Sequence, residues 1–461
     1  MLLEKNSTIR GFFKYKNLIF WLFVFIAGFV FIYDPGALPW CGEIQHDQVK
    51  SVSLAYKANQ LNKLSTDSLT GSLELTYHPL QIWILQFLLL VTKNNMVMVV
   101  FFKTIIIVLI SWGSLYYLSK KMDYPRYPLL LFFLSIDCHL FCRQLTGDKF
   151  LMPVLFLLLV AYSIFHESKS RTSFIGLLVC IITLLHLYLV MAYTVLAFVV
   201  TFLIFDFAWI KKNSIFFFFS FFSAIFICFP YLYNFFNQFQ TVSSFSPFIP
   251  NDCSLKMLPV MLFGGDPFCN SISWLIGGNI LSSPPPSLSY VLKSSMAVSR
   301  LGFLLILLGM LSGFVSLIKK KRSGSFFLLE DRIGSWAFLS IIVFAILMFV
   351  FRIFPFTDYL VSLWICYFFC LWRFIKVGKN RMLKFFNLLY IFSTGILFCF
   401  FFYALYYQND FVPYLSLKNS VNIAKKITNY SPKSKIYIAI DLSERYKDYL
   451  QTVNRNIASN K

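Results

Sequence analysis

The stretch HPLQIWILQFLLLVT (His78–Thr92) sets how many times the chain is expected to cross a membrane and on which side each later loop lies. It is almost wholly apolar, yet it is shorter than the roughly 20 residues that a helix needs to cross the hydrocarbon core of a bilayer. Counting it as a crossing would invert the sidedness of every later loop. We therefore predict that this stretch is a helix that lies in, or dips into, the outer leaflet.

The composition around this stretch is that of a polytopic membrane protein. Of the 461 residues, 58% are hydrophobic and only 13% are charged, and the mean hydropathy is +0.70. Because a lipid-exposed backbone must satisfy its own hydrogen bonds, the expected class is all-α. The net charge of +21 does not indicate a nucleic-acid-binding protein, since the basic residues lie in loops between apolar runs and no soluble basic domain is present.

Eleven other apolar runs are expected to be transmembrane helices. They lie at about 18–33, 96–118, 127–141, 150–165, 173–190, 192–210, 214–233, 301–318, 334–351, 359–375 and 385–407. With this count, 21 of the 41 lysines and arginines fall in short loops on the side of the N-terminus. The positive-inside rule then predicts a cytoplasmic N-terminus, a periplasmic C-terminus and a location in the bacterial inner membrane.

The expected domains follow from this threading. They are a cytoplasmic start (1–17), a transmembrane core (18–407) with outer loops at about 34–95, 142–149 and 234–300, and a periplasmic tail (408–461). In the tail, VNIAKKI has helical spacing and KIYIAIDL alternates like a strand, which predicts a small α/β unit. Cys253 and Cys269 share the third outer loop, as a disulfide or as two thiols.

The first outer loop opens with YDPGALPWCGEIQHDQVKS (residues 33–51), which contains two carboxylates four residues apart. On a helix Glu43 and Asp47 would share a face, and their repulsion would raise the pKa of one of them and favour it as a general base. The alternative is that Asp47 only caps the following helix and Glu43 is solvated.

The residues that follow, 47–64, have a modest amphipathic pattern. Val49, Val52, Tyr56 and Leu61 fall near one helical stripe. We expect a helix that lies on the membrane surface, although an ordinary loop helix has the same pattern.

The second outer loop, within CRQLTGDKFLMP (residues 142–153), places Asp148 between two cations, Arg143 and Lys149. Such a loop can present an anion site beside an acid at the membrane surface, although Asp148 could also serve only as a helix cap. Asp137, near the end of the preceding run, is the competing candidate for the acid of this loop.

Two further ionisable residues lie within or next to apolar runs. His186 is interpreted as a hydrogen-bonded core histidine in preference to a ligand, because no partner stands at ligand spacing. Arg352 could anchor its helix at the interface or hold a lipid-linked phosphate. The cysteines have no CxxC or Cys/His metal spacing.

The order of these features resembles the GT-C superfamily of membrane glycosyltransferases. The resemblance rests on GEIQHDQ (42–48) for the first-loop acids, TYHPLQIWILQFLLL (76–90) for the closing proline motif, and RQLTGDKFLMP (143–153) for the second-loop Asp. It covers roughly the first 210 residues. It departs from the family where the adjacent Asp-Glu pair is replaced by Glu43 and Asp47 and where His78-Pro79 replaces Pro-Pro.

Length and the short tail look most like the serotype-converting O-antigen glucosyltransferases. The resemblance implies transfer of a hexose, glucose above all, from undecaprenyl-phosphate-sugar to an O-antigen repeat unit on the periplasmic face. It implies Glu43 or Asp47 as the base and Asp148 as a supporting acid. The implied substrate-binding residues are Arg143, Lys149, Arg352 and His78. No cofactor is expected beyond the lipid-linked donor, although some relatives use a divalent metal.

Two other functions remain open. A transporter or flippase of lipid-linked sugars would place charges at mid-membrane in broken helices, whereas the acids here gather on the outer side. An O-antigen polymerase would favour arginines in a large late outer loop, but 234–300 carries only Lys256, Lys293 and Arg300.

Overall fold

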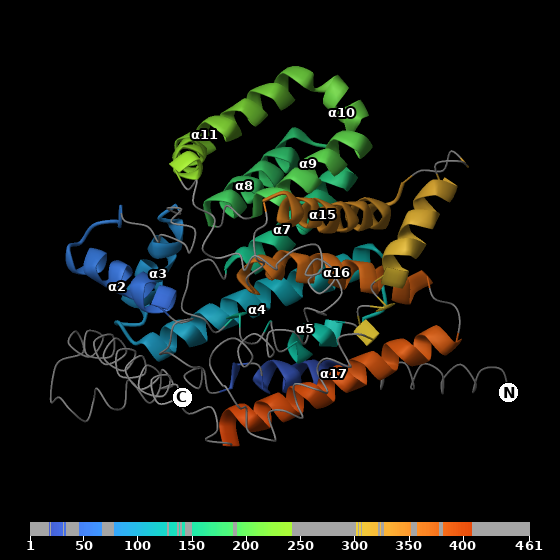
Figure 1. The fold of residues 1–461 in the computed structure, drawn as a ribbon, viewed down its shortest axis with the longest axis horizontal. Helices are drawn as coiled ribbons and strands as arrows, with labels where there is room; N and C mark the ends of the chain where they lie inside the picture. Colours follow the sequence, from blue (N-terminus) through green and yellow to red (C-terminus); the bar gives the residue numbers. More distant parts are fainter. Residues whose placement is uncertain are drawn as a thin grey trace, which may run out of the picture.

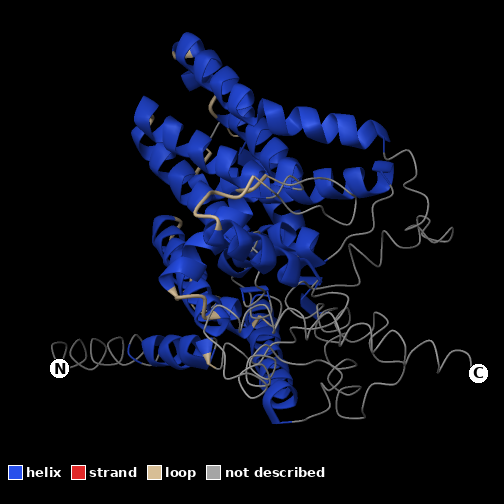
Figure 2. Cartoon of the chain, turned by 90° about the vertical axis from the view of Figure 1, so that its left-hand side faces the viewer, coloured by secondary structure: helices blue, strands red, loops and turns tan. Residues whose placement is uncertain are grey.

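The computed structural model describes residues 18–33, 46–66, 78–142, 150–187, 191–241, 301–351, 357–377 and 381–407, apart from short gaps at 19, 31, 127–128, 136–137, 139–140, 303, 306, 321–322 and 324–326. Within these ranges every regular element is helical and no strand occurs, as Figure 2 shows. The all-α prediction is confirmed for this part of the chain. The predicted α/β tail, the Cys253 and Cys269 pair and most of the third outer loop lie outside the described residues.

The helices, labelled as in Figure 1, have the following bounds. They are α2 His46–Gln60, α3 Leu80–Val91, α4 Met96–Lys121, α5 Leu130–Leu134, α7 Leu151–Ser168, α8 Arg171–Leu187, α9 Ala192–Phe205, α10 Phe207–Lys212, α11 Ser214–Thr241, α15 Leu329–Phe351, α16 Thr357–Val377 and α17 Arg381–Tyr407. Residues 20–30 and 307–320 are also helical. By length and composition, two described helices could cross a membrane, namely α4 and α7.

Three predicted spans differ from what is observed. The run at 127–141 is interrupted, because α5 ends at Leu134. The next residue, Ser135, has an extended backbone, and its hydroxyl accepts the backbone N–H of Cys138. The run at 192–210 divides at Asp206 into α9 and α10. In contrast, α11 continues to Thr241, so the third outer loop starts later than residue 234.

The long helices lie side by side, with α11 along one side of the bundle and α17 along the other (Figure 1). The closest pairs are α7 with α8, α9 with α15, α15 with α16, and α4 with α7. One large apolar core joins them. We call the end of the bundle that holds α2 and α3 the outer end, and the end that holds Lys121 and Asp206 the inner end.

The described residues of the predicted first outer loop form a packed unit with its own apolar core. Side chains of α2 and α3 pack together against the start of α4, separately from the main core. Val52 and Tyr56 are buried there, as the stripe predicts. Leu61 is 64% exposed, which corrects the prediction, because α2 ends at Gln60 and the stripe does not extend into the turn. We call α2, the turn at 61–66 and α3 the outer unit.

The outer face of α3 is apolar and exposed. Phe87, Leu90 and Val91, which are spaced by three and four residues, are 64%, 62% and 55% exposed. Such a face is stable against lipid and costly against water. That α3 lies in the outer leaflet stays a prediction.

The side-chain amide of Gln86 links the turn at 61–66 and the end of α2 to α3. Gln86 accepts the backbone N–H of Ser65 at 3.0 Å and donates to the Lys63 carbonyl at 2.9 Å and to Asn59 Oδ1 at 3.2 Å. Trp83 adds a hydrogen bond from Nε1 to the Ser65 carbonyl at 2.8 Å. The turn after α2 is therefore held against α3 through buried polar contacts, which are costly to leave unpaired.

Replacing Gln86 by Leu should destabilise the outer unit by about 2–3 kcal/mol, because the Ser65 N–H and the Lys63 carbonyl lose their partner. The measurement is the rate of proteolysis within 61–66 in the detergent-purified protein. Gln60→Leu, at the exposed end of α2, is the matched control. Equal cleavage of both variants would contradict the role given to Gln86.

At the inner end, Asp331 joins three segments. Its fully buried carboxylate pairs with Lys320 at 2.5 Å and Arg373 at 2.8 Å, and it accepts the backbone N–H of Leu328 at 2.9 Å. Next to it, Glu330 pairs with Lys376 at 2.6 Å, and Lys376 also donates to the carbonyl of Met122 at 2.6 Å. These contacts hold the helix ending at 320, α15, α16 and the end of α4 together.

Gly334 makes room for the Arg373 guanidinium. A Cβ on Gly334 would overlap Arg373 Nη1, and the arginine could move away only by giving up Asp331. Gly334→Ala should therefore destabilise the protein by about 1–3 kcal/mol. Gly176→Ala in α8, where a Cβ meets nothing within 4 Å, should be neutral or stabilising. Thermal unfolding of both variants in one detergent checks the difference, and equal midpoints would refute it.

Candidate functional site

Most of the residues that the sequence nominates lie outside the described residues: Glu43, Arg143, Asp148, Lys149 and Arg352. Asp137 lies outside them as well. Asp47 is the second residue of α2, so its backbone is in the first turn of a helix that packs on α3. His78, two residues before α3, is described with its side chain.

His78 lies against a second histidine. The rings of His78 and His186 are 4.3 Å apart between centroids and nearly perpendicular, and Trp83 contacts His78 from the same unit at 5.5 Å. His186 is on the last turn of α8 and is buried. The structure therefore brings the closing motif of the first outer loop onto the outer end of α8. The prediction that His186 is a hydrogen-bonded core histidine is confirmed, because it is buried and its Nδ1 lies 2.8 Å from the Ile182 carbonyl. Spacing along the chain does not reveal the His78 ring, which belongs to a residue 108 positions away.

Backbone partners define which nitrogen of each ring carries a proton. The backbone N–H of Leu80 donates to His78 Nδ1 at 3.1 Å, so neutral His78 has its proton on Nε2. His186 Nδ1 lies 2.8 Å from the Ile182 carbonyl, which can only accept, so neutral His186 has its proton on Nδ1. The pair thus combines an Nε2–H donor on His78 with an Nε2 acceptor on His186.

Adjacent to this pair, Gln81 attaches the outer unit to the bundle. Its amide nitrogen donates to the carbonyl of Leu187 at the end of α8, and the Gln81 side chain is buried. With the contacts of α3 against α4 and α8, this hydrogen bond positions His78 and the start of α3 relative to the helices.

The His78 environment predicts a pH dependence. Burial, and secondly the nearby His186 ring, lower the pKa of His78 to about 4 from 6.5. Between these values the unfolded chain binds more protons than the folded one, so stability falls as the pH drops from about 6.5 toward 4. His78→Asn keeps an acceptor for Leu80 and cannot titrate, so it should flatten this slope. Thermal midpoints between pH 4 and 7.5 test it, and an unchanged slope would overturn the assignment.

A buried lysine in α4 is a residue that the sequence reading missed. Lys103 is fully buried, and the next residue, Thr104, donates to the carbonyl of Cys142 at 3.2 Å. That contact places this part of α4 beside the residue that precedes the second outer loop. The sequence does contain a signal for Lys103, because an ionisable residue inside an apolar run is costly to bury and is commonly functional.

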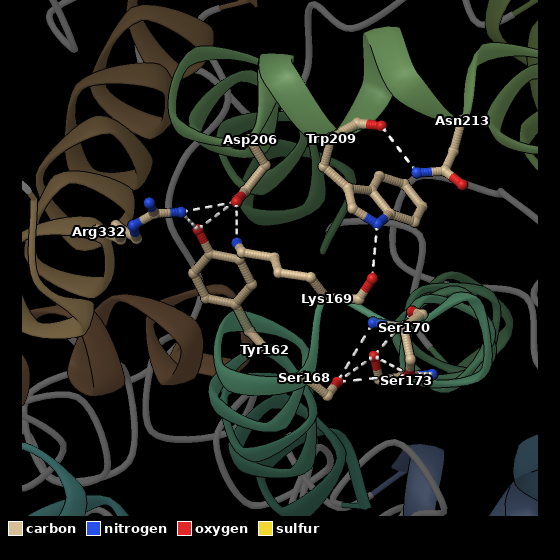
Figure 3. A network of polar contacts seen from close by, with 9 residues as sticks. All are labelled: Tyr162, Ser168, Lys169, Ser170, Ser173, Asp206, Trp209, Asn213 and Arg332. Carbon is tan, nitrogen blue, oxygen red and sulfur yellow. Dashed lines mark hydrogen bonds and ion pairs between the residues drawn. The ribbon is translucent and has the colours of Figure 1, made fainter.

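A further polar network lies at the inner end, far from the histidines along the helices (Figure 3). The buried carboxylate of Asp206 accepts from the Tyr162 hydroxyl at 2.9 Å, from Arg332 Nη1 at 2.7 Å and from Lys169 Nζ. Trp209 fixes the backbone beside Lys169 through a 2.8 Å bond to its carbonyl. This network joins α7, α9, α10 and α15.

Among the described residues, no group of three or more His, Cys, Asp or Glu side chains could hold a metal ion. At His78 the Leu80 hydrogen bond also requires the lone pair on Nδ1, which disfavours a metal on Nε2 of the neutral ring. Comparison with protein-family models, with curated proteins and with solved structures finds no match to this chain.

Proposed function

We propose that this protein is a membrane glycosyltransferase that moves a hexose from undecaprenyl-phosphate-sugar to an O-antigen or similar lipid-linked glycan on the periplasmic face. The observation that supports it best is the outer unit. It is a pair of helices that we place next to the membrane, with Asp47 in the first turn of α2 and His78 two residues before α3. The pair packs on the outer ends of α4 and α8. A polyprenyl donor cannot leave the bilayer, so the reacting groups must lie at such an interface.

The reaction requires a base, a cation and a place for the acceptor. Glu43 or Asp47 takes the proton of the acceptor hydroxyl as its oxygen attacks the anomeric carbon, and the lipid phosphate leaves with the bonding electrons. Single displacement inverts the anomeric configuration. Arg143, Lys149 and Arg352 are the candidates for stabilising the phosphate, with Asp148 as a supporting acid.

His78 has a defined place in this proposal. Since its Nδ1 accepts from Leu80 and its ring lies against His186, it contributes to substrate binding by holding the start of α3 at the outer end of α8, and it does not act as the base. Its low pKa keeps it neutral at periplasmic pH values near 7.

The test is expression in bacteria that carry a defined O-antigen, with and without a polyprenyl-phosphate-glucose synthase. The expected result is one added hexose per repeat unit by mass spectrometry, and only when the donor is made. No mass change with any donor system would reject the proposal.

One observation favours a second function, a transporter or flippase for lipid-linked sugars. Lys103 is fully buried within a helix long enough to cross a membrane, and charges at depth are typical of transport pathways. Movement of a labelled lipid-linked sugar across vesicles that contain the purified protein, without transfer to an acceptor, would support this function.

A further inference from the structure

Nearly all described carboxylates at the inner end form ion pairs with cations of the same chain. Glu167 pairs with Lys121 at 2.8 Å, and Asp206, Glu330 and Asp331 each hold at least one cation. Among the described carboxylates of this end, Asp123 alone is outside these pairs. Internal pairing therefore leaves little negative charge on the inner surface.

Several basic residues remain without such a pair. In the part of the chain that is described, no carboxylate pairs with six of them, which are Lys120, Arg126, Arg171, Lys211, Lys212 and Lys319. Among the described residues, the inner surface thus carries more positive charge than the ion pairs neutralise.

Three of these cations gather around α10. Lys211 and Lys212 are exposed in its last turn. Arg171 comes from the start of α8, where its Nε donates to Asn213 Oδ1 at 3.2 Å and its guanidinium covers the Phe216 ring at 5.3 Å. Tertiary packing, and not proximity in sequence, brings the third cation to the other two.

Large apolar side chains are exposed on the same segment of the chain. Ile204, Phe207 and Ile215 are 66%, 63% and 87% exposed. Trp209 and Ile210 are buried, and Trp209 donates to the Lys169 carbonyl (Figure 3), so one face of α10 is packed while Phe207, Lys211 and Lys212 are exposed. We call Arg171, Ile204, Phe207, Lys211, Lys212 and Ile215 the α10 patch.

We propose that the α10 patch binds anionic phospholipid of the inner leaflet, with Arg171, Lys211 and Lys212 facing the headgroup phosphate and the apolar residues entering the acyl region. Mixed basic and apolar exposure fits this partner better than a nucleic acid, which would leave Phe207 and Ile215 in water. This surface lies at the opposite end from the proposed sugar site and does not depend on it.

The test measures thermal unfolding of the full chain in neutral detergent with added phosphatidylglycerol or phosphatidylcholine. We expect phosphatidylglycerol to raise the midpoint by several degrees and phosphatidylcholine to leave it unchanged. Inorganic phosphate at matched ionic strength should also leave it unchanged, which separates the lipid from its phosphate alone.

Two charge variants make the test specific to the patch. Lys211→Gln/Lys212→Gln should lose most of the rise, whereas Lys120→Gln/Lys319→Gln removes the same charge from the same end and should keep it. An equal response of both variants, or an equal effect of the two lipids, would overturn the proposal. Because no sugar transfer is measured, this outcome is independent of the glycosyltransferase proposal.

Discussion

Glu43→Gln is expected to lower sugar transfer by about 10²–10⁴-fold, while protein level and membrane insertion stay unchanged. The amide occupies the space of the carboxylate but cannot take the proton of the acceptor hydroxyl. If Asp47 is the base instead, the same loss appears in Asp47→Asn. The measurement is hexose added to the O-antigen by membranes that contain each variant, at matched protein amounts.

Asp34→Asn is the control for this prediction. Asp34 precedes Pro35-Gly36 in the predicted first outer loop, a sequence that is typical of a turn, and no role in the chemistry is proposed for it. It should retain transfer. Normal transfer by both Glu43→Gln and Asp47→Asn would remove the first outer loop from the chemistry and would favour the transporter.

Asp206→Leu should have the largest effect on stability, about 3–5 kcal/mol. The carboxylate is buried and accepts from Tyr162, Lys169 and Arg332, so its loss leaves the Arg332 guanidinium, whose side chain is 12% exposed, without its charge partner. The measurement is the midpoint of thermal unfolding in detergent. Asp123→Asn removes an exposed carboxylate of the same end and should change the midpoint little.

A double variant separates lost pairing from lost packing. Asp206→Leu/Arg332→Met removes both charges, so it should be less destabilising than Asp206→Leu alone. If the single and double variants lose equal stability, the cost comes from packing around Asp206 and not from a stranded cation.

Local pattern accounts for much of the helical organisation. Periodicity and apolar length depend on neighbours within a few residues, so the sequence predicts α4, α7 and the two surface helices of the first outer loop close to their observed bounds. It fails where a side chain overrides the pattern. The two places are Asp206, whose carboxylate pairs with Arg332 of α15, and the end of α5, where the Ser135 hydroxyl accepts the backbone N–H of Cys138.

Composition predicts the all-α class, which is confirmed for the described residues. The sidedness and the roles of Glu43 and Asp47 stay predictions, because they rest on charge bias and on spacing within single segments. Only the tertiary structure decided that His78 meets His186, that Gln86 closes the outer unit, and that Arg332 reaches Asp206 across 126 positions. The reason is physical. Helical periodicity sets which face a residue occupies, but only packing between helices sets which face of another helix it meets.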